Sequence, residues 1–177
     1  MKLHLNKEDF TDLIRLTAQD MNILEVYIEK DYWVCYILKN LSKSEYLENI
    51  VFKGGTSLSK AYGLIERFSE DIDLQLLNFE GGDSKKKNLI KKIETEITVG
   101  LQKLENHKRE SKSGNIRKTI YSYEKYTDGD NFFQGSKELV LEINSMSTPE
   151  PYEKREIKSY ISEFLEKTNK EYIKEYE

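Results

Sequence analysis

The chain of 177 residues has a single cysteine, Cys35, so no disulfide can form within it. It has only two prolines, Pro149 and Pro151, which together predict one interruption of secondary structure at residues 147–151. No apolar run approaches the ~20 residues of a membrane-spanning helix, and the N-terminus lacks the apolar core of a signal peptide. We therefore expect a cytoplasmic protein that makes no use of a membrane.

Hydrophobic residues are also scarce, at 37%, while charged residues make up 34%. Aromatic side chains nevertheless reach 11%, with twelve tyrosines, and this argues against disorder. A length of 177 residues is enough for one domain with a proper core. We therefore expect a single domain over residues 1–177.

The chain lacks an excess of positive charge, since its net charge is −4, but its basic residues are concentrated in one region. Residues 85–118 carry eleven basic and four acidic side chains, whereas the segments before and after this region are net acidic. A basic stretch from Lys85 to Lys118 inside an acidic protein is suited to hold a polyanion such as RNA. The alternative is a solvated helix face whose lysines bind nothing.

The most distinctive stretch of the chain is VFKGGTSLSKAYGLIERFSEDIDLQLL, at residues 51–77. Gly54 and Gly55 permit a tight turn or a close approach of the backbone that a Cβ atom would block. Thr56 or Ser57 can cap a following helix, and the free N–H groups at the start of a helix attract phosphate. These four residues are therefore candidates for binding the phosphates of a nucleotide.

The same stretch ends in two acids at strand spacing. Asp71 and Asp73 alternate with apolar residues, so they are expected on one face of a strand, close enough to hold the same cation. Mg²⁺ prefers one or two carboxylates together with substrate phosphate oxygens. A third acid, Glu142, lies inside an apolar strand predicted at residues 139–144, where it is costly unless it is paired or binds a metal. The alternatives are an exposed acidic strand and, for Glu142, a cross-strand ion pair.

Three further side chains are candidates for contacts with a nucleotide. Lys53 precedes the glycines, and it either faces the triphosphate or is a surface charge. Ser69 lies two residues before Asp71, where its hydroxyl either contacts the nucleotide or belongs to a simple turn. Lys30 is centred on the apolar stripe of a helix predicted at residues 23–40, so it extends to solvent, pairs with an acid or points into a site.

The periodicity of the whole chain predicts an α/β (α+β) fold, with a small mixed sheet that carries the acids, flanking helices and an N-terminal helical segment. Two helices are expected within residues 1–50, the first capped by Asn6. The catalytic core is expected at residues 51–145, with a helix at 85–102 and strands at 71–77, 117–126 and 139–144. A C-terminal helix is expected at residues 153–167.

FKGGTSL at residues 52–58, followed by RFSEDIDL at residues 67–74, resembles the AbiEii/AbiGii family of nucleotidyltransferase-fold toxins. This family belongs to the DNA-polymerase-β-like superfamily, and the resemblance extends from about residue 28 to residue 165. It implies a nucleotidyltransferase fold in which Glu142 is the third acid. It also implies a toxin of a toxin–antitoxin or phage-defence system that transfers a nucleotide from an NTP to an RNA, such as tRNA, or to a protein acceptor. Relatives act on the acceptor end of tRNA, and a partner antitoxin is expected. Family members usually continue into a C-terminal helical domain, for which this sequence shows no counterpart.

These expectations combine into a mechanism in which Asp71, Asp73 and Glu142 are the catalytic, metal-binding residues. They would hold one or two Mg²⁺ or Mn²⁺ ions that clamp both oxygens of an in-line displacement. Two alternatives remain. One is a non-catalytic remnant that binds a nucleotide or an antitoxin. The other is a glycosyltransferase whose DxD motif binds a sugar nucleotide, against which the upstream GGTS segment argues.

Overall fold

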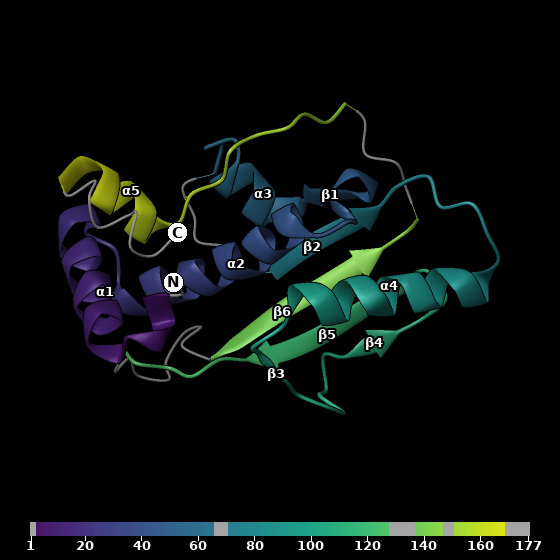
Figure 1. The fold of residues 1–177 in the computed structure, drawn as a ribbon, viewed down its shortest axis with the longest axis horizontal. Coiled ribbons are helices and arrows are strands. Elements are labelled where there is room, and N and C mark those ends of the chain that lie inside the picture. The colour runs from purple at the N-terminus through teal and green to yellow at the C-terminus, as the bar shows by residue number, and fades with distance from the viewer. Residues whose placement is uncertain (1–2, 66–70, 128–136, 147–150, 169–177) are drawn as a thin grey trace. The chain divides into compact units, whose positions relative to one another are not determined.

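The computed structural model describes residues 3–65, 71–127, 137–146 and 151–168. In chain order the helices and strands are η1 (Leu3–Leu5), α1 (Lys7–Met21), α2 (Glu25–Lys43), η2 (Leu47–Asn49), β1 (Ile50–Lys53), α3 (Gly54–Lys60), β2 (Asp71–Leu76), α4 (Asp83–Ile97), β3 (Gln102–Lys103), β4 (Ser111–Lys112), β5 (Ile116–Ser122), β6 (Glu138–Asn144) and α5 (Tyr160–Thr168). Figure 1 shows these elements as a ribbon. The expected mixed α/β fold is confirmed.

The chain divides into two compact units. The sheet unit comprises the described parts of Tyr36–Tyr123 and Glu138–Ile157. The helical unit comprises those of Met1–Cys35, Glu124–Lys137 and Lys158–Glu177. The boundary at Cys35 falls within α2.

The sheet unit is built on a six-stranded mixed sheet with the order β1-β2-β6-β5-β3, and β4 pairs with β5. β2 and β6 run parallel, as the arrows in Figure 1 show, whereas β1 and β5 are antiparallel to their neighbours. The predicted alternation of β2 is confirmed, because Ile72, Leu74 and Leu76 are buried while Asp71 and Asp73 are partly exposed. On β2, therefore, one face is apolar and the other carries the two acids and the buried Gln75.

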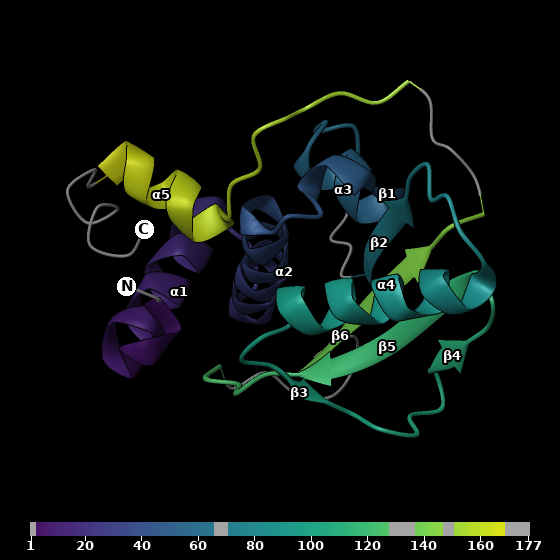
Figure 2. The same ribbon diagram turned by 45° about the vertical axis from the view of Figure 1, so that its right-hand side comes forward.

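Helix α4 covers the apolar face of this sheet, and Figure 2 shows it lying along β5 and β6. Its buried Glu94 accepts hydrogen bonds from Arg117 and, at 2.6 Å, from the hydroxyl of Tyr121, both on β5. Lys103 lies 3.4 Å from the same carboxylate. Burial acts to raise the pKa of Glu94, but the hydrogen bonds from Arg117 and Tyr121 outweigh it, and the pKa is lowered. Glu94 is therefore a paired, ionised anchor for α4.

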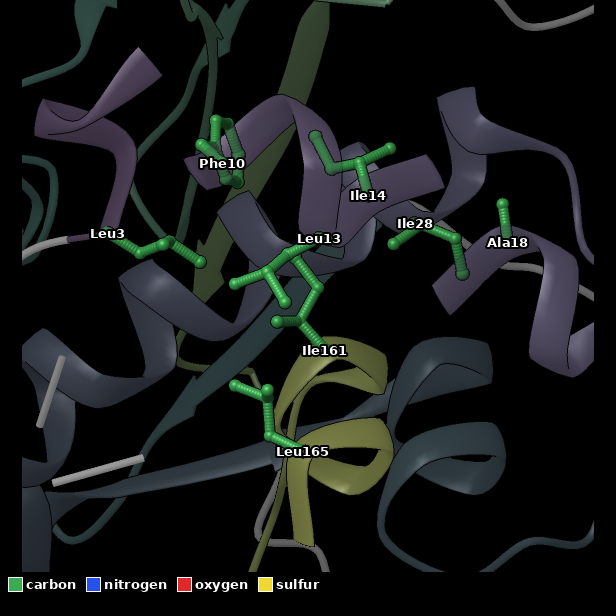
Figure 3. Packing of buried hydrophobic residues seen from close by; sticks show 8 residues of the cluster. All are labelled: Leu3, Phe10, Leu13, Ile14, Ala18, Ile28, Ile161 and Leu165. Atoms are coloured by element: carbon green, nitrogen blue, oxygen red, sulfur yellow. The ribbon is translucent and has the colours of Figure 1, made fainter. Parts of the chain in front are cut away.

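The helical unit has its own apolar core. Asn6 caps α1, as predicted, by accepting from the backbone N–H of Asp9, and α1 ends at Asn22 in the left-handed region with φ of 53°. The carboxylate of Asp31, on α2, accepts a 2.8 Å hydrogen bond from the backbone N–H of Tyr160, the first residue of α5. The residues of the core, drawn in Figure 3, are Leu3, Phe10, Leu13, Ile14, Ala18, Ile28, Ile161 and Leu165.

The C-terminal helix differs from the prediction at residues 153–167. It begins only at Tyr160, and the described residues 151–159 before it are not helical. Side chains of this segment bond elsewhere in the sheet unit instead: Lys154 lies 2.6 Å from Glu48, and Arg155 donates to the carbonyl of Ala61 at 3.2 Å. The helical spacing of apolar residues on which the prediction rested, at positions 157, 160, 161, 164 and 165, therefore corresponds to a helix only from Tyr160 onward.

Three other boundaries differ. The helix predicted at 85–102 ends at Ile97, because Gly100 has a φ of 89° that a helix cannot accommodate. The strand predicted at 117–126 ends at Ser122, and the polar segment after α4 holds the short strands β3 and β4. In the described residues, no helix has both the length and the apolar character needed to cross a bilayer.

Candidate active site

The three predicted acids lie on the face of the sheet opposite α4. β2 presents Asp71 and Asp73, and the parallel pairing of β2 with β6 places Glu142 directly beside Asp73. Side chains at paired positions of neighbouring strands point to the same face, with Cα atoms about 5 Å apart. The prediction of a third carboxylate on an adjacent strand is therefore confirmed in its geometry.

The pairing of β1 and β5 extends this arrangement to a row of four charged residues. Lys53 on β1 is paired with Asp73, and Lys118 on β5 is paired with Glu142. The charge row is thus Lys53, Asp73, Glu142 and Lys118, one residue from each of four neighbouring strands. The ammonium group of Lys118 lies 3.5 Å from the carboxylate of Glu142, and both side chains are partly exposed. The alternative expected for Glu142, a cross-strand ion pair, is therefore also present.

The pKa of Asp73 is perturbed by its surroundings. Burial raises the pKa of Asp73, and the negative charges of Glu142 and Asp71 raise it further, while Lys53 and Lys118 act in the opposite direction. Two carboxylates on adjacent strands resist ionising together unless a cation lies between them. Such a perturbed carboxylate on an accessible face is typical of functional sites.

Gly54 lies against this pair of acids. It follows β1 with a φ of +76°, a conformation that other residues adopt only with strain. A Cβ atom at this position would lie 2.1 Å from Oδ2 of Asp73. The predicted close approach of the backbone is therefore present, and the group that approaches it is a carboxylate of the site.

The structure corrects the prediction that Thr56 or Ser57 caps the next helix. α3 begins earlier, at Gly54, and its N-cap residue is Lys53, whose side chain makes no capping hydrogen bond. Thr56 and Ser57, the third and fourth residues of α3, are buried, and the hydroxyl of Thr56 donates to the backbone carbonyl of Asp71. Thr56 therefore ties α3 to the start of β2, which holds the glycine turn beside the acids.

The remaining predicted nucleotide contacts have different outcomes. Gly55 is in the first turn of α3, next to Gly54, and is partly exposed. Ser69 lies outside the described residues. Lys30 belongs to the helical unit and is fully buried, so it does not extend to solvent. Its contact with a nucleotide stays a prediction.

The donor set of the site fits a hard divalent cation, because Asp71, Asp73 and Glu142 supply carboxylate oxygens from two adjacent strands. A cation there would relieve the repulsion that raises the pKa of Asp73. Within the described ranges, however, no three His, Cys, Asp or Glu side chains converge closely enough to enclose an ion. In the structure the Glu142 carboxylate is paired with Lys118.

The structure divides the basic stretch between two faces of the sheet. The exposed lysines of α4 lie on the face opposite the acids; these are Lys85, Lys87, Lys91 and Lys92. Lys118, by contrast, lies on the face of the acids. The part of an acceptor that is bound at the acids therefore cannot also contact the lysines of α4.

Lys118 is the residue that sequence reasoning missed as part of the site. Its alternation with Ile120 predicts that both share one face of a strand, but alternation does not reveal which strand lies next to it. The register that pairs Lys118 with Glu142 joins segments 24 positions apart, and only the folded sheet shows it.

A search of curated proteins gives no match. A crystal structure from H. pylori, provisionally described as a nucleotidyltransferase, is similar with 23% identity and a TM-score of 0.49. The similarity covers 77% of this chain and 53% of that one, so the chain spans about half the length of that protein. Residues 36–172 match the family described as nucleotidyl transferase AbiEii toxin of type IV toxin–antitoxin systems. Since this match covers most of the chain, the chain belongs to the AbiEii nucleotidyltransferase toxin family.

Proposed function

We propose that the chain is a metal-dependent nucleotidyltransferase that transfers a nucleotide from an NTP to a hydroxyl of an RNA, with tRNA as the leading candidate. The observation that carries the proposal is the placement of Glu142 beside Asp73 on one sheet face, with Gly54 against the same carboxylate. Nucleotidyltransferases of this family generally use a divalent metal and an NTP. Membership of a toxin family of type IV toxin–antitoxin systems supports an antitoxin protein as its partner, and we propose that it acts in the cytoplasm.

Asp71, Asp73 and Glu142 would hold Mg²⁺ or Mn²⁺. A bound ion of this kind supplies charge neutralisation on the phosphates and lowers the pKa of an attacking hydroxyl. In the proposed reaction the acceptor oxygen forms a bond to the α-phosphorus, the bond from the α-phosphorus to the bridging oxygen breaks, and pyrophosphate leaves. Asp73 or Glu142, whose carboxylates lie side by side on β2 and β6, would accept the proton of the hydroxyl.

The triphosphate is proposed to lie toward β1. Gly54 and Gly55 leave their backbone uncovered there, and Lys53 precedes them at the end of the charge row. Phosphoryl groups are bound mainly by positive charge and backbone N–H groups, both of which this corner offers. α3 has only seven residues, so the lysine and the glycine turn carry this assignment, and the helix dipole does not.

The test is a transfer assay with the purified chain, Mg²⁺, each of the four labelled NTPs and total tRNA. We expect labelled RNA with at least one NTP. Asp71→Ala should abolish the label because it removes a metal ligand from the acids of the site. Asp83→Ala is the matched control: it removes an exposed aspartate at the start of α4, on the other side of the sheet, and should leave the label unchanged.

Each negative result of this assay points to a different alternative function. If no NTP yields labelled RNA while nucleotide still binds, a non-catalytic binding module of the same fold replaces the enzyme proposal. If a sugar nucleotide is hydrolysed and NTPs are not used, the site is that of a glycosyltransferase. Equal labelling by the unaltered protein and Asp71→Ala would remove the acids from the reaction.

A further inference from the structure

Lys118 stands out because its charge is placed at the site yet is engaged with one of the proposed metal ligands. Its ammonium group lies 3.5 Å from Glu142, and the two side chains are 30% and 25% exposed. A partly exposed pair of this kind contributes little to stability. The pair is therefore weak enough to open when a divalent cation competes for Glu142.

When the pair opens, the ammonium group of Lys118 would stay on the face of the acids without a carboxylate partner in the charge row. A lysine side chain is long and flexible, so its ammonium group can swing several ångströms while its backbone stays in β5. The charges that approach this face in the proposed reaction are phosphates. Lys118 is thus suited to exchange a carboxylate for a phosphate when substrate and metal bind.

The strand order indicates whether this phosphate belongs to the NTP or to the acceptor. Lys53 and the glycine turn are on the β1 side of the two acids, and Lys118 is on the β5 side. An in-line displacement puts the attacking oxygen and the leaving pyrophosphate on opposite sides of the α-phosphorus. If pyrophosphate leaves toward Lys53, the acceptor must enter from the side of Lys118.

We propose that Lys118 is a positioning residue for the acceptor: it releases Glu142 when a divalent cation binds, and its ammonium group then contacts a phosphate next to the attacking hydroxyl. The inference rests on the proposed function and deepens it, because it predicts an acceptor that carries a phosphate beside its reactive end. The exposed lysines of α4 cannot substitute for this contact, since they lie on the opposite face of the sheet.

The experiment compares the full chain with Lys118→Met, Lys118→Arg and Lys91→Met, the last of which removes an exposed lysine from α4 as a charge-matched control. Mn²⁺ binding is measured alone by electron paramagnetic resonance, without nucleotide or RNA. Since Lys118 competes for Glu142, Lys118→Met should bind Mn²⁺ roughly two- to five-fold more tightly. Lys118→Arg and Lys91→Met should bind it as the unaltered protein does.

Transfer kinetics form the second arm. Loss of a charge-assisted contact to a phosphate should raise the KM for the RNA acceptor about ten-fold in Lys118→Met, with the KM for NTP changed less than about two-fold. Lys118→Arg should recover most of the acceptor affinity. A rise in the KM for NTP with an unchanged acceptor KM would overturn the acceptor role, because Lys118 would then serve the triphosphate.

The two proposals can fail separately. If the unaltered protein labels no RNA, the proposed function fails, and the binding of a fluorescent RNA in the presence of Mn²⁺ replaces the kinetic arm. Weaker RNA binding by Lys118→Met than by Lys91→Met then supports the role of Lys118. Equal binding, or a Mn²⁺ affinity that Lys118→Met leaves unchanged, overturns it.

Discussion

Replacing Gly54 by alanine would place a methyl group against the carboxylate of Asp73. The new Cβ atom would lie 2.1 Å from Oδ2, whereas an ordinary contact begins at 3.4 Å, so the carboxylate must move by about 1 Å. The backbone adds a second cost, because alanine at a φ of +76° is strained by roughly 1–2 kcal/mol. A displacement of 1 Å at a reacting group can cost about 10²-fold in rate.

Gly63 offers a matched control for this substitution. Its φ is +61°, so alanine there pays a similar backbone cost, but a Cβ atom at Gly63 would meet nothing within 4 Å. Both variants should therefore lose roughly 2–8 °C in Tm by thermal denaturation. In the transfer assay we expect Gly54→Ala to lose about 10²-fold in kcat and Gly63→Ala to keep nearly all of it. Equal kcat values for the two variants would refute the reasoning, since the contact with Asp73 is what distinguishes them.

Three further predictions concern stability. Because the pKa of Asp73 is raised in the folded state, ionisation of Asp73 destabilises the fold once the pH exceeds the ordinary aspartate range. Asp73→Asn should therefore raise the Tm at pH 7 but not near pH 3. A change in Tm that does not depend on pH would contradict this reasoning. Arg117→Met should lower the free energy of urea unfolding by about 1–3 kcal/mol, because the buried Glu94 carboxylate then keeps only Tyr121 and Lys103 as partners, and adding Glu94→Gln should recover part of the loss. Equal stabilities of the single and double variants would contradict that pairing. Asp31→Ala removes the acceptor of the Tyr160 N–H, so it should lower the free energy of unfolding by about 0.5–2 kcal/mol and speed hydrogen exchange in the first turn of α5. Asp20→Ala, at an exposed position, should change neither quantity.

Local patterns predicted those parts of the fold that depend on neighbours in sequence. The cap at Asn6 and the alternation around Asp71 both follow from side chains within a few residues, and the structure confirms both. The expectation that Glu142 lies on a strand beside the acids rested on a different argument. A charged residue in an apolar strand needs a reason, and its position beside Asp73 supplies one.

Cross-strand register could not be predicted in the same way. Lys53 and Lys118 flank the acids because β1 and β5 pair at particular positions, and side-chain alternation alone is compatible with several registers. The start of α3 at Gly54 also escaped prediction, since a left-handed glycine can begin a helix as well as end one. Helix periodicity likewise failed at residues 153–159, where charged side chains bond to distant parts of the sheet unit.

The charge row carries a consequence for the order in which ligands bind. Lys53 and Lys118 together cancel the formal charges of Asp73 and Glu142, so the row as a whole is neutral and only Asp71 adds a negative charge. A lone divalent ion would leave this surface electropositive, whereas an ion that arrives on a triphosphate brings its own compensation. We therefore expect metal and nucleotide to bind as one complex, with each strengthening the other, and the free protein to hold either of them only weakly.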